Sequence, residues 1–135
     1  MKKITPELAL RIGLAGTFLY AGVNSLLNPT AWIGYIPQWV ELLGSPLRQV
    51  VPELVEGLQF RQIFLTLHGI FEILLAIALL VGIRKKLTAL LAFLSLAAIV
   101  ITYGIDDVSF RDFGLLAATY ALMLLSKSQH LNISK

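Results

Sequence analysis

The 135-residue sequence contains no cysteine and little charge. The absence of cysteine excludes disulfides, thiol redox chemistry and thiolate metal ligands within the chain. Charged residues make up only 14% of the sequence, whereas soluble domains contain about 25%. The basic residues are dispersed and the net charge is only +3, so we expect no binding to nucleic acid.

Histidine is also scarce, with two residues in the chain. His68 and Glu72 are too few ligands for a metal ion, and His130 lies in the last part of the sequence, on the opposite side of the predicted membrane. We therefore expect no metal site and no covalently bound cofactor.

Hydrophobic residues are what the chain has in excess, at 57% of the total and a mean hydropathy of +0.80. A bilayer core about 30 Å thick needs roughly 20 helical residues to cross it. Four stretches are long enough or nearly so: 8–27, 62–83, 86–105 and 111–126. We predict an all-α polytopic membrane protein with a single membrane domain over 1–135. Its fold is a compact antiparallel bundle of four transmembrane helices, with a long amphipathic outer loop at 28–61.

Lysine and arginine placement predicts the orientation of these spans. One side of the membrane would hold Lys2, Lys3, Arg84, Lys85, Lys86, Lys127 and Lys135, and the other only Arg48, Arg61 and Arg111. We therefore expect an integral protein of the plasma (inner) membrane with both termini in the cytoplasm.

Small and polar residues recur along each span at helical spacing. The first span repeats them every four residues, and in the second Gly69 and Ala76 flank Glu72; the first-span set is Ala9, Gly13, Thr17, Ala21 and Ser25. Small residues allow close helix contact where lipid provides no hydrophobic drive for association. We expect these faces, and Gly114 in the fourth span, to point inward.

Two ionisable residues interrupt the second span, His68 and Glu72, and their i,i+4 spacing puts them on one helix face. Ionisable groups inside a membrane are costly and mark functional sites by default. Asn24 and Tyr103 reach a similar depth, and Asp106, Arg111 and Asp112 would form a solvated outer rim. The pair is either the polar end of a ligand pocket or a clamp that holds the helices together.

We expect Arg11 and the long loop at 28–61 to have structural roles. Glu7 lies one turn before Arg11, which predicts an ion pair at the inner interface. Within 28–61, we expect a short amphipathic segment on the outer surface, with Pro52 at the start of a second short helix. This segment is either an interfacial cover that shields helix ends or a lid over a cavity.

Three segments together resemble the DoxX-like family of small four-helix membrane proteins (DoxX/DoxD). These are "LRIGLAGTFLYAGVNSLLNPTAWIGYIP", "HGIFEILLAIALLVG" and "FRDFGLLAA". The resemblance implies a membrane bundle, with Arg11, Asn24, Gly69 and Glu72 at family-like positions. Some relatives are linked to redox metabolism, including a subunit of thiosulfate:quinone oxidoreductase. Without cysteine, electron transfer here would need a bound quinone or the cofactor of a partner.

Three functions are compatible with this pattern. The first is a redox-associated membrane subunit in which His68 and Glu72, assisted by Asn24 and Tyr103, bind a small apolar molecule such as a quinone. The second is a component of a small-solute transporter or channel, and the third is a membrane scaffold for a partner enzyme. The expected partners are membrane lipid, a redox enzyme subunit and a second copy of the chain.

Overall fold

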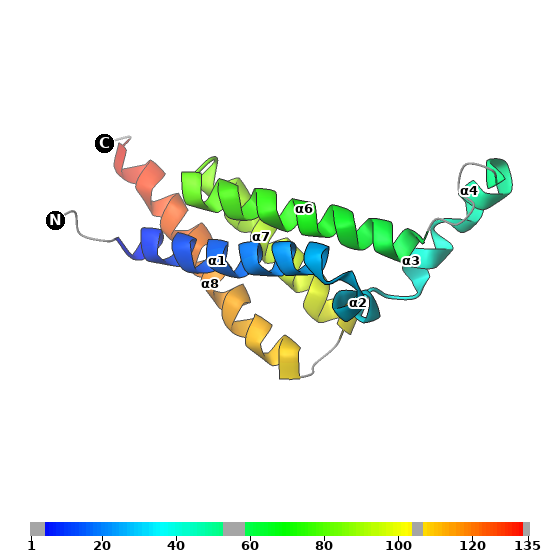
Figure 1. The fold of residues 1–135 in the computed structure, drawn as a ribbon. Coiled ribbons are helices and arrows are strands. Elements are labelled where there is room, and N and C mark those ends of the chain that lie inside the picture. The colour runs from blue at the N-terminus through cyan, green and yellow to red at the C-terminus, as the bar shows by residue number, and fades with distance from the viewer. Residues whose placement is uncertain (1–4, 53–58, 104–106, 134–135) are drawn as a thin grey trace. The chain divides into compact units, whose positions relative to one another are not determined.

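The computed structural model describes residues 5–52, 59–103 and 107–133, and these residues form helices and short connections (Figure 1). The helices are α1 (Pro6–Leu27), α2 (Pro29–Trp32), η1 (Ile33–Tyr35), α3 (Trp39–Leu42), α4 (Ser45–Val50), α6 (Phe60–Val81), α7 (Lys85–Tyr103) and α8 (Asp107–Ile133). The described residues contain no β-strand. The predicted all-α class is confirmed.

The long helices lie close to the predicted spans. The ends of α1, α6 and α7 fall within two residues of the predicted limits, whereas α8 extends beyond its apolar stretch at both ends. Hydrophobicity marks the part of a helix that can lie in lipid, and backbone hydrogen bonds continue the helix into polar sequence.

Two of the described helices are long and apolar enough to cross a membrane. They are α1 and α6, each of 22 residues. The apolar part of α8, Asp112–Ser126, is shorter. Length and composition thus support two of the four predicted spans.

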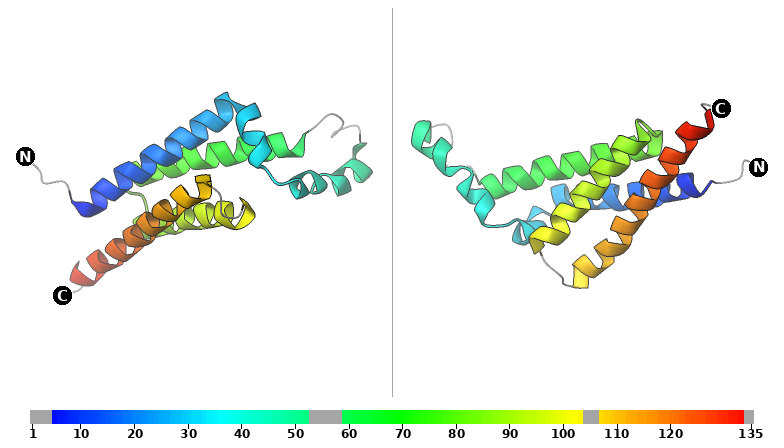
Figure 2. Two further views of the ribbon diagram at one scale, coloured as in Figure 1. Left: turned by 90° about the horizontal axis from the view of Figure 1, so that it is seen from below. Right: turned by 180° about the vertical axis from the view of Figure 1, so that it is seen from behind.

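The chain divides into two compact units, and α1 and α6 contribute residues to both. The first unit comprises Met1–Leu19 and Leu74–Lys135. In it, α7 packs against α8 (Figure 2). Its fully buried residues include Ala76, Leu79, Ala89 and Leu122.

The second unit, Tyr20–Ile73, contains the predicted outer loop. The loop contains four short helical elements, α2, η1, α3 and α4. Ile36, Val40 and Leu65 form a buried cluster, with Trp32 and Ile33 packed against it. The short helix predicted after Pro52 lies outside the described residues.

The small-residue face predicted for α1 is wrong in its first half. Ala9 and Gly13 are exposed, whereas Leu14, Ala15 and Phe18 are buried. Four residues turn a helix about 40° beyond a full turn, so a repeat of four drifts off the core face. A face that stays buried advances alternately by three and four residues. In α8, Gly114 is likewise exposed, contrary to the prediction.

The prediction holds for α6. Gly69, Glu72 and Ala76 are all buried, as expected for one inward face.

Candidate functional site

Helix α6 carries the predicted site, and both of its ends are stabilised by side chains from other helices. The helix has no acidic residue in its first turn and no basic residue in its last turn. Helix ends leave unpaired backbone groups, with partial positive charge at the N-terminus and partial negative charge at the C-terminus. Complementary charges must therefore come from elsewhere in the chain.

Arg11 of α1 provides the cation at the C-terminus of α6. Its Nε donates to the carbonyl oxygen of Leu79, and its Nη2 donates to that of Leu80, both at 2.7 Å. Gly82 follows with φ of +80°, and a Cβ at this position would lie 2.5 Å from Arg11 Nη2. Glycine is therefore required both by the backbone conformation and by the space that the guanidinium occupies.

The buried carboxylate of Glu7 lies beside Arg11. Arg11 Nη1 lies 3.7 Å from Glu7 Oε1, which confirms the predicted ion pair. Lys85, the first residue of α7, lies closer, with Nζ 2.7 Å from the same oxygen. Glu7 is buried, so these two cations offset the cost of removing its charge from water.

Glu41 of α3 provides the anion at the N-terminus of α6. Its Oε2 accepts a hydrogen bond from the backbone N–H of Arg61 at 3.3 Å, and its Oε1 accepts one from Arg48 Nη2 at 2.6 Å. The Arg48 hydrogen bond is the main reason that the pKa of Glu41 lies below its ordinary value, and the backbone amides of α6 lower it further. The Arg61 side chain donates through Nη2 to the carbonyl of Ile33.

His68 and Glu72 lie on the same face of α6, as predicted. His68 Nε2 is 3.6 Å from Glu72 Oε1. The imidazole has Phe64 and Phe71 on its two sides along the helix, with ring centroids 6.1 and 6.3 Å away. The His68 side chain is 27% exposed and that of Glu72 only 7%, so a molecule outside the helix would reach the histidine first.

A close helix crossing lies beside Glu72. A Cβ added to Gly22 of α1 would be 2.6 Å from the carbonyl oxygen of Gly69 and 3.1 Å from Glu72 Cβ. A Cβ added to Gly69 would be 2.5 Å from Ser25 Oγ. The two glycines therefore let the backbones of α1 and α6 approach closely in the second unit.

Asn24 takes part in a different arrangement from the one predicted. Its Nδ2 donates to Tyr20 Oη at 3.1 Å, and its Oδ1 accepts from Asn28 Nδ2 at 2.7 Å. Tyr20 lies on α1 and Asn28 directly follows it, so the described side-chain hydrogen bonds of Asn24 are to residues one turn away in the sequence. The sequence predicted its depth but not these partners.

The other predicted site residues belong to the first unit. The side chains of Tyr103 and Arg111, and the whole of Asp106, lie outside the described structure. Asp112 is only 6% exposed, so its prediction as a solvated rim residue is wrong. Helix α8 begins at Asp107, which puts Asp112 in the second turn of the helix rather than in the turn before it.

Metal ligands are not grouped in the described part of the chain. No set of three or more His, Asp or Glu side chains there could hold an ion. The chemistry available on α6 is hydrogen bonding and proton exchange by an imidazole and a carboxyl group.

The helical fold of the described residues and the two helices long and apolar enough to cross a membrane are those expected of a small membrane protein. The sequence model of the DoxX family matches residues 7–104. The chain therefore belongs to the DoxX family, as the resemblance predicted. Searches of curated proteins and of solved structures found no match to the chain.

Proposed function

We propose that this DoxX-family chain is a redox-associated membrane subunit that binds a small apolar molecule with a polar end, such as a quinone, beside His68 and Glu72. The observation that carries the proposal is the pairing of two ionisable side chains within a 22-residue apolar helix. Such groups are costly in lipid and are found where they meet a ligand, a proton or each other.

The pair keeps hydrogen-bonding capacity for a third group. A separation of 3.6 Å between His68 Nε2 and Glu72 Oε1 is longer than a direct hydrogen bond. Phe64 and Phe71 add aromatic surface on either side of the imidazole, which suits a flat apolar ring. These residues fit a quinone head group.

The chain's own residues would bind the head group and handle protons. A bound quinone would supply the electron-accepting chemistry, and the electrons would come from a partner redox enzyme. The His68 imidazole would hydrogen-bond a carbonyl oxygen through Nε2. The more sheltered Glu72 carboxyl would exchange a proton with the imidazole, in the way that positioned side chains act as general acids and bases.

The proposal includes the membrane arrangement. Four helices would span the plasma membrane with both termini in the cytoplasm, because three basic residues follow α6: Arg84 lies just before α7, and Lys85 and Lys86 begin it. Family membership and the apolar character of α1 and α6 support this arrangement. A redox partner and a second copy of the chain are further parts of the proposal.

The test is quinone binding by purified protein in detergent. His68→Ala and Glu72→Gln should each weaken the binding of a short-chain ubiquinone by about tenfold, the effect of losing one good hydrogen bond in a dry site. Thr66→Val, an exposed position on the same helix, is the matched control and should bind normally. Unchanged affinity in both site variants, with unfolding temperatures near that of the wild type, would contradict the proposal.

A scaffold role is the second candidate, and the helix crossing favours it. Glu72 Cβ lies beside Gly22 at the close crossing of α1 and α6 in the second unit, where a side chain can stabilise packing. In this case Glu72→Gln would lower the unfolding temperature and leave quinone affinity unchanged, and the protein would co-purify with a partner enzyme.

A further inference from the structure

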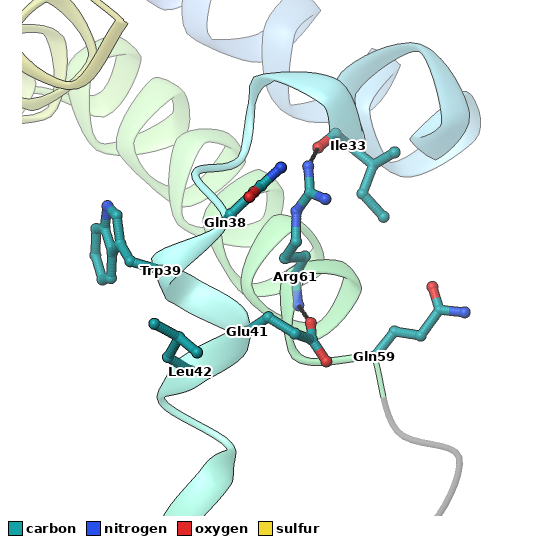
Figure 3. A pocket seen from close by; sticks show the side chains of 7 residues that line it. All are labelled: Ile33, Gln38, Trp39, Glu41, Leu42, Gln59 and Arg61. Atoms are coloured by element: carbon teal, nitrogen blue, oxygen red, sulfur yellow. Dashed lines mark hydrogen bonds between the residues drawn. The ribbon is translucent and has the colours of Figure 1, made fainter.

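A cavity of about 530 Å³ lies in the second unit, between α3 and the start of α6 (Figure 3). His68 and Glu72 do not line it. Its volume falls within the range of small-molecule sites, which combine apolar walls with a few convergent polar groups. The cavity therefore has the size and the mixed lining of a ligand site.

Arg61 is the cation of this lining, and the described residues leave part of its guanidinium unpaired. Nη2 donates to the carbonyl oxygen of Ile33. Nε is buried and has no hydrogen-bond partner in the part of the chain that the structure describes. A buried donor without an acceptor is unfavourable, and an anionic oxygen forms a stronger hydrogen bond with a guanidinium than a neutral carbonyl does. An oxyanion in the cavity can therefore compete with Ile33 for Arg61.

Glu41 also lines the cavity, but its charge is matched by an arginine outside the lining. Arg48 Nη2 lies 2.6 Å from Glu41 Oε1, and the other carboxylate oxygen accepts from the backbone N–H of Arg61. The ion pairs among the described residues do not include the Arg61 side chain. Two arginines thus accompany one described carboxylate, and the N-terminus of α6 adds partial positive charge. The charge at this cavity favours an anion.

Gln38 and Gln59 are exposed and supply further donors to the cavity. They directly precede α3 and α6. Each carboxamide carries two N–H donors beside its acceptor oxygen. The phosphate of a phosphodiester presents acceptor oxygens and no donor, so a lining of one guanidinium and two carboxamides fits it.

The apolar part of the lining includes Trp39 and Leu42, which are 53% and 68% exposed. They belong to the segment that joins α1 to α6, the two helices that are long and apolar enough to cross a membrane. In the membrane arrangement proposed above, this segment lies at the membrane surface, where tryptophan is enriched. An apolar wall beside a cation suits an amphiphile better than a free ion.

We infer that this cavity binds the phosphate of an anionic phospholipid, such as phosphatidylglycerol. The guanidinium of Arg61 donates to the phosphate oxygens, and the carboxamides donate to the phosphate or to the glycerol beyond it. The acyl chains leave the cavity over Trp39 and Leu42. A zwitterionic lipid is disfavoured, because its cationic head group would lie beside Arg61. The inference rests on the proposed membrane arrangement but not on quinone binding, which involves other residues.

The test uses fluorescence of Trp39 in the full chain carrying Trp32→Phe, which removes the other tryptophan. The protein is reconstituted in phosphatidylcholine vesicles, in which a lipid brominated on its acyl chains replaces an increasing share of the bilayer. Brominated phosphatidylglycerol should quench at mole fractions about tenfold lower than brominated phosphatidylcholine, the factor expected for one charge-assisted hydrogen bond. Equal quenching by the two lipids would overturn the inference.

Arg61→Gln should abolish the preference for phosphatidylglycerol. Lys86→Gln is the matched control, because it removes the same charge at an exposed position outside the cavity, and it should keep the preference. Gln38→Leu combined with Gln59→Leu changes only exposed side chains and should weaken the preference about threefold, since neutral hydrogen bonds contribute less. An unchanged preference in both cavity variants, or an equal loss in the Lys86 control, would contradict the assignment.

Inorganic phosphate distinguishes a lipid from a free anion. Millimolar phosphate, with the ionic strength matched by chloride, should leave the preference for phosphatidylglycerol in place, because a free ion lacks the acyl chains that contact Trp39 and Leu42. Loss of the preference in phosphate would mean that the cavity takes a free anion and would overturn the lipid as its occupant.

Discussion

Arg11 Nε lies 2.7 Å from the carbonyl oxygen of Leu79, a residue 68 positions further along the chain. This hydrogen bond gives the last turn of α6 a partner that its own sequence lacks, since that turn contains no basic residue. The guanidinium also brings a positive charge to the negative end of the helix dipole. The arginine of α1 thus acts as a C-terminal cap for a different helix.

Replacing Arg11 should destabilise the protein. Arg11→Ala removes two charge-assisted hydrogen bonds to backbone carbonyls and should lower the free energy of unfolding by about 2 kcal/mol. Arg11→Lys should recover only part of this, because one ammonium group does not reproduce the planar fork of the guanidinium. Thermal unfolding in detergent measures both, with exposed Lys86→Ala as control. An Arg11→Ala protein as stable as the control would refute the capping role.

Gly82 should be energetically coupled to Arg11. In the wild type, Gly82→Ala meets both an unfavourable φ of +80° and the guanidinium. In an Arg11→Ala background only the backbone strain remains, about 1 kcal/mol. A double-mutant cycle of unfolding free energies should therefore show Gly82→Ala to be less harmful in that background. Strictly additive effects would mean that the two residues do not compete for the same space.

The positions of the helices could be predicted from the sequence, because apolar runs about 20 residues long have few other structural explanations. The pairing of Arg11 with Glu7 followed from i,i+4 spacing. The contact with Leu79 could not be predicted, since it depends on how α1 and α6 align. The lack of an acidic residue in the first turn of α6 and of a basic residue in its last turn is a usable signal, because it indicates that the complementary charges come from elsewhere.

The candidate site could be predicted only in part, because the sequence shows local pairings but not contacts between helices. His68 and Glu72 share a helix, so their pairing follows from local geometry. The hydrogen bonds of Asn24 to Tyr20 and Asn28 are also local, but its depth suggested a role in binding a ligand. Glu41 was missed as a cap, because choosing among the glutamates of the outer loop requires the folded loop.

The glycines of the helix crossing should be intolerant of any side chain. Gly69→Ala would bring Cβ to 2.5 Å from Ser25 Oγ, and Gly22→Ala would bring it to 2.6 Å from the backbone oxygen of Gly69. Overpacking of this kind typically destabilises by about 2 kcal/mol. Gly22→Ala should be the worse of the two, since backbone moves less easily than the Ser25 hydroxyl.

Gly16 provides the matched control on the same helix, with nothing within 4 Å of an added Cβ. Gly16→Ala should change the unfolding free energy by no more than about 1 kcal/mol, and alanine's better helix propensity favours a gain. Unfolding temperatures of the three variants, measured in one detergent, test the ranking. Equal effects at Gly16 and Gly22 would argue against a specific crossing.

Glu41 should make stability depend on pH in the acidic range. Its pKa in the folded protein is lower than the ordinary value of 4.5, chiefly because Arg48 donates to it. The folded state therefore binds the proton less readily than the unfolded state, so the contribution of Glu41 is complete above pH 4.5 and is lost as the pH falls. Unfolding temperatures of wild type and Glu41→Gln should differ at pH 7 and converge toward pH 3. A difference that is constant over this range would contradict the role of its charge.

The two capping residues have a further consequence for biosynthesis. Arg11 and Glu41 both precede α6, which begins at Phe60. A ribosome therefore completes both caps before the first residue of α6 is made. The helix that carries His68 and Glu72 can find the partners for its two ends already in place when it leaves the translocation machinery, without waiting for the C-terminal half of the protein.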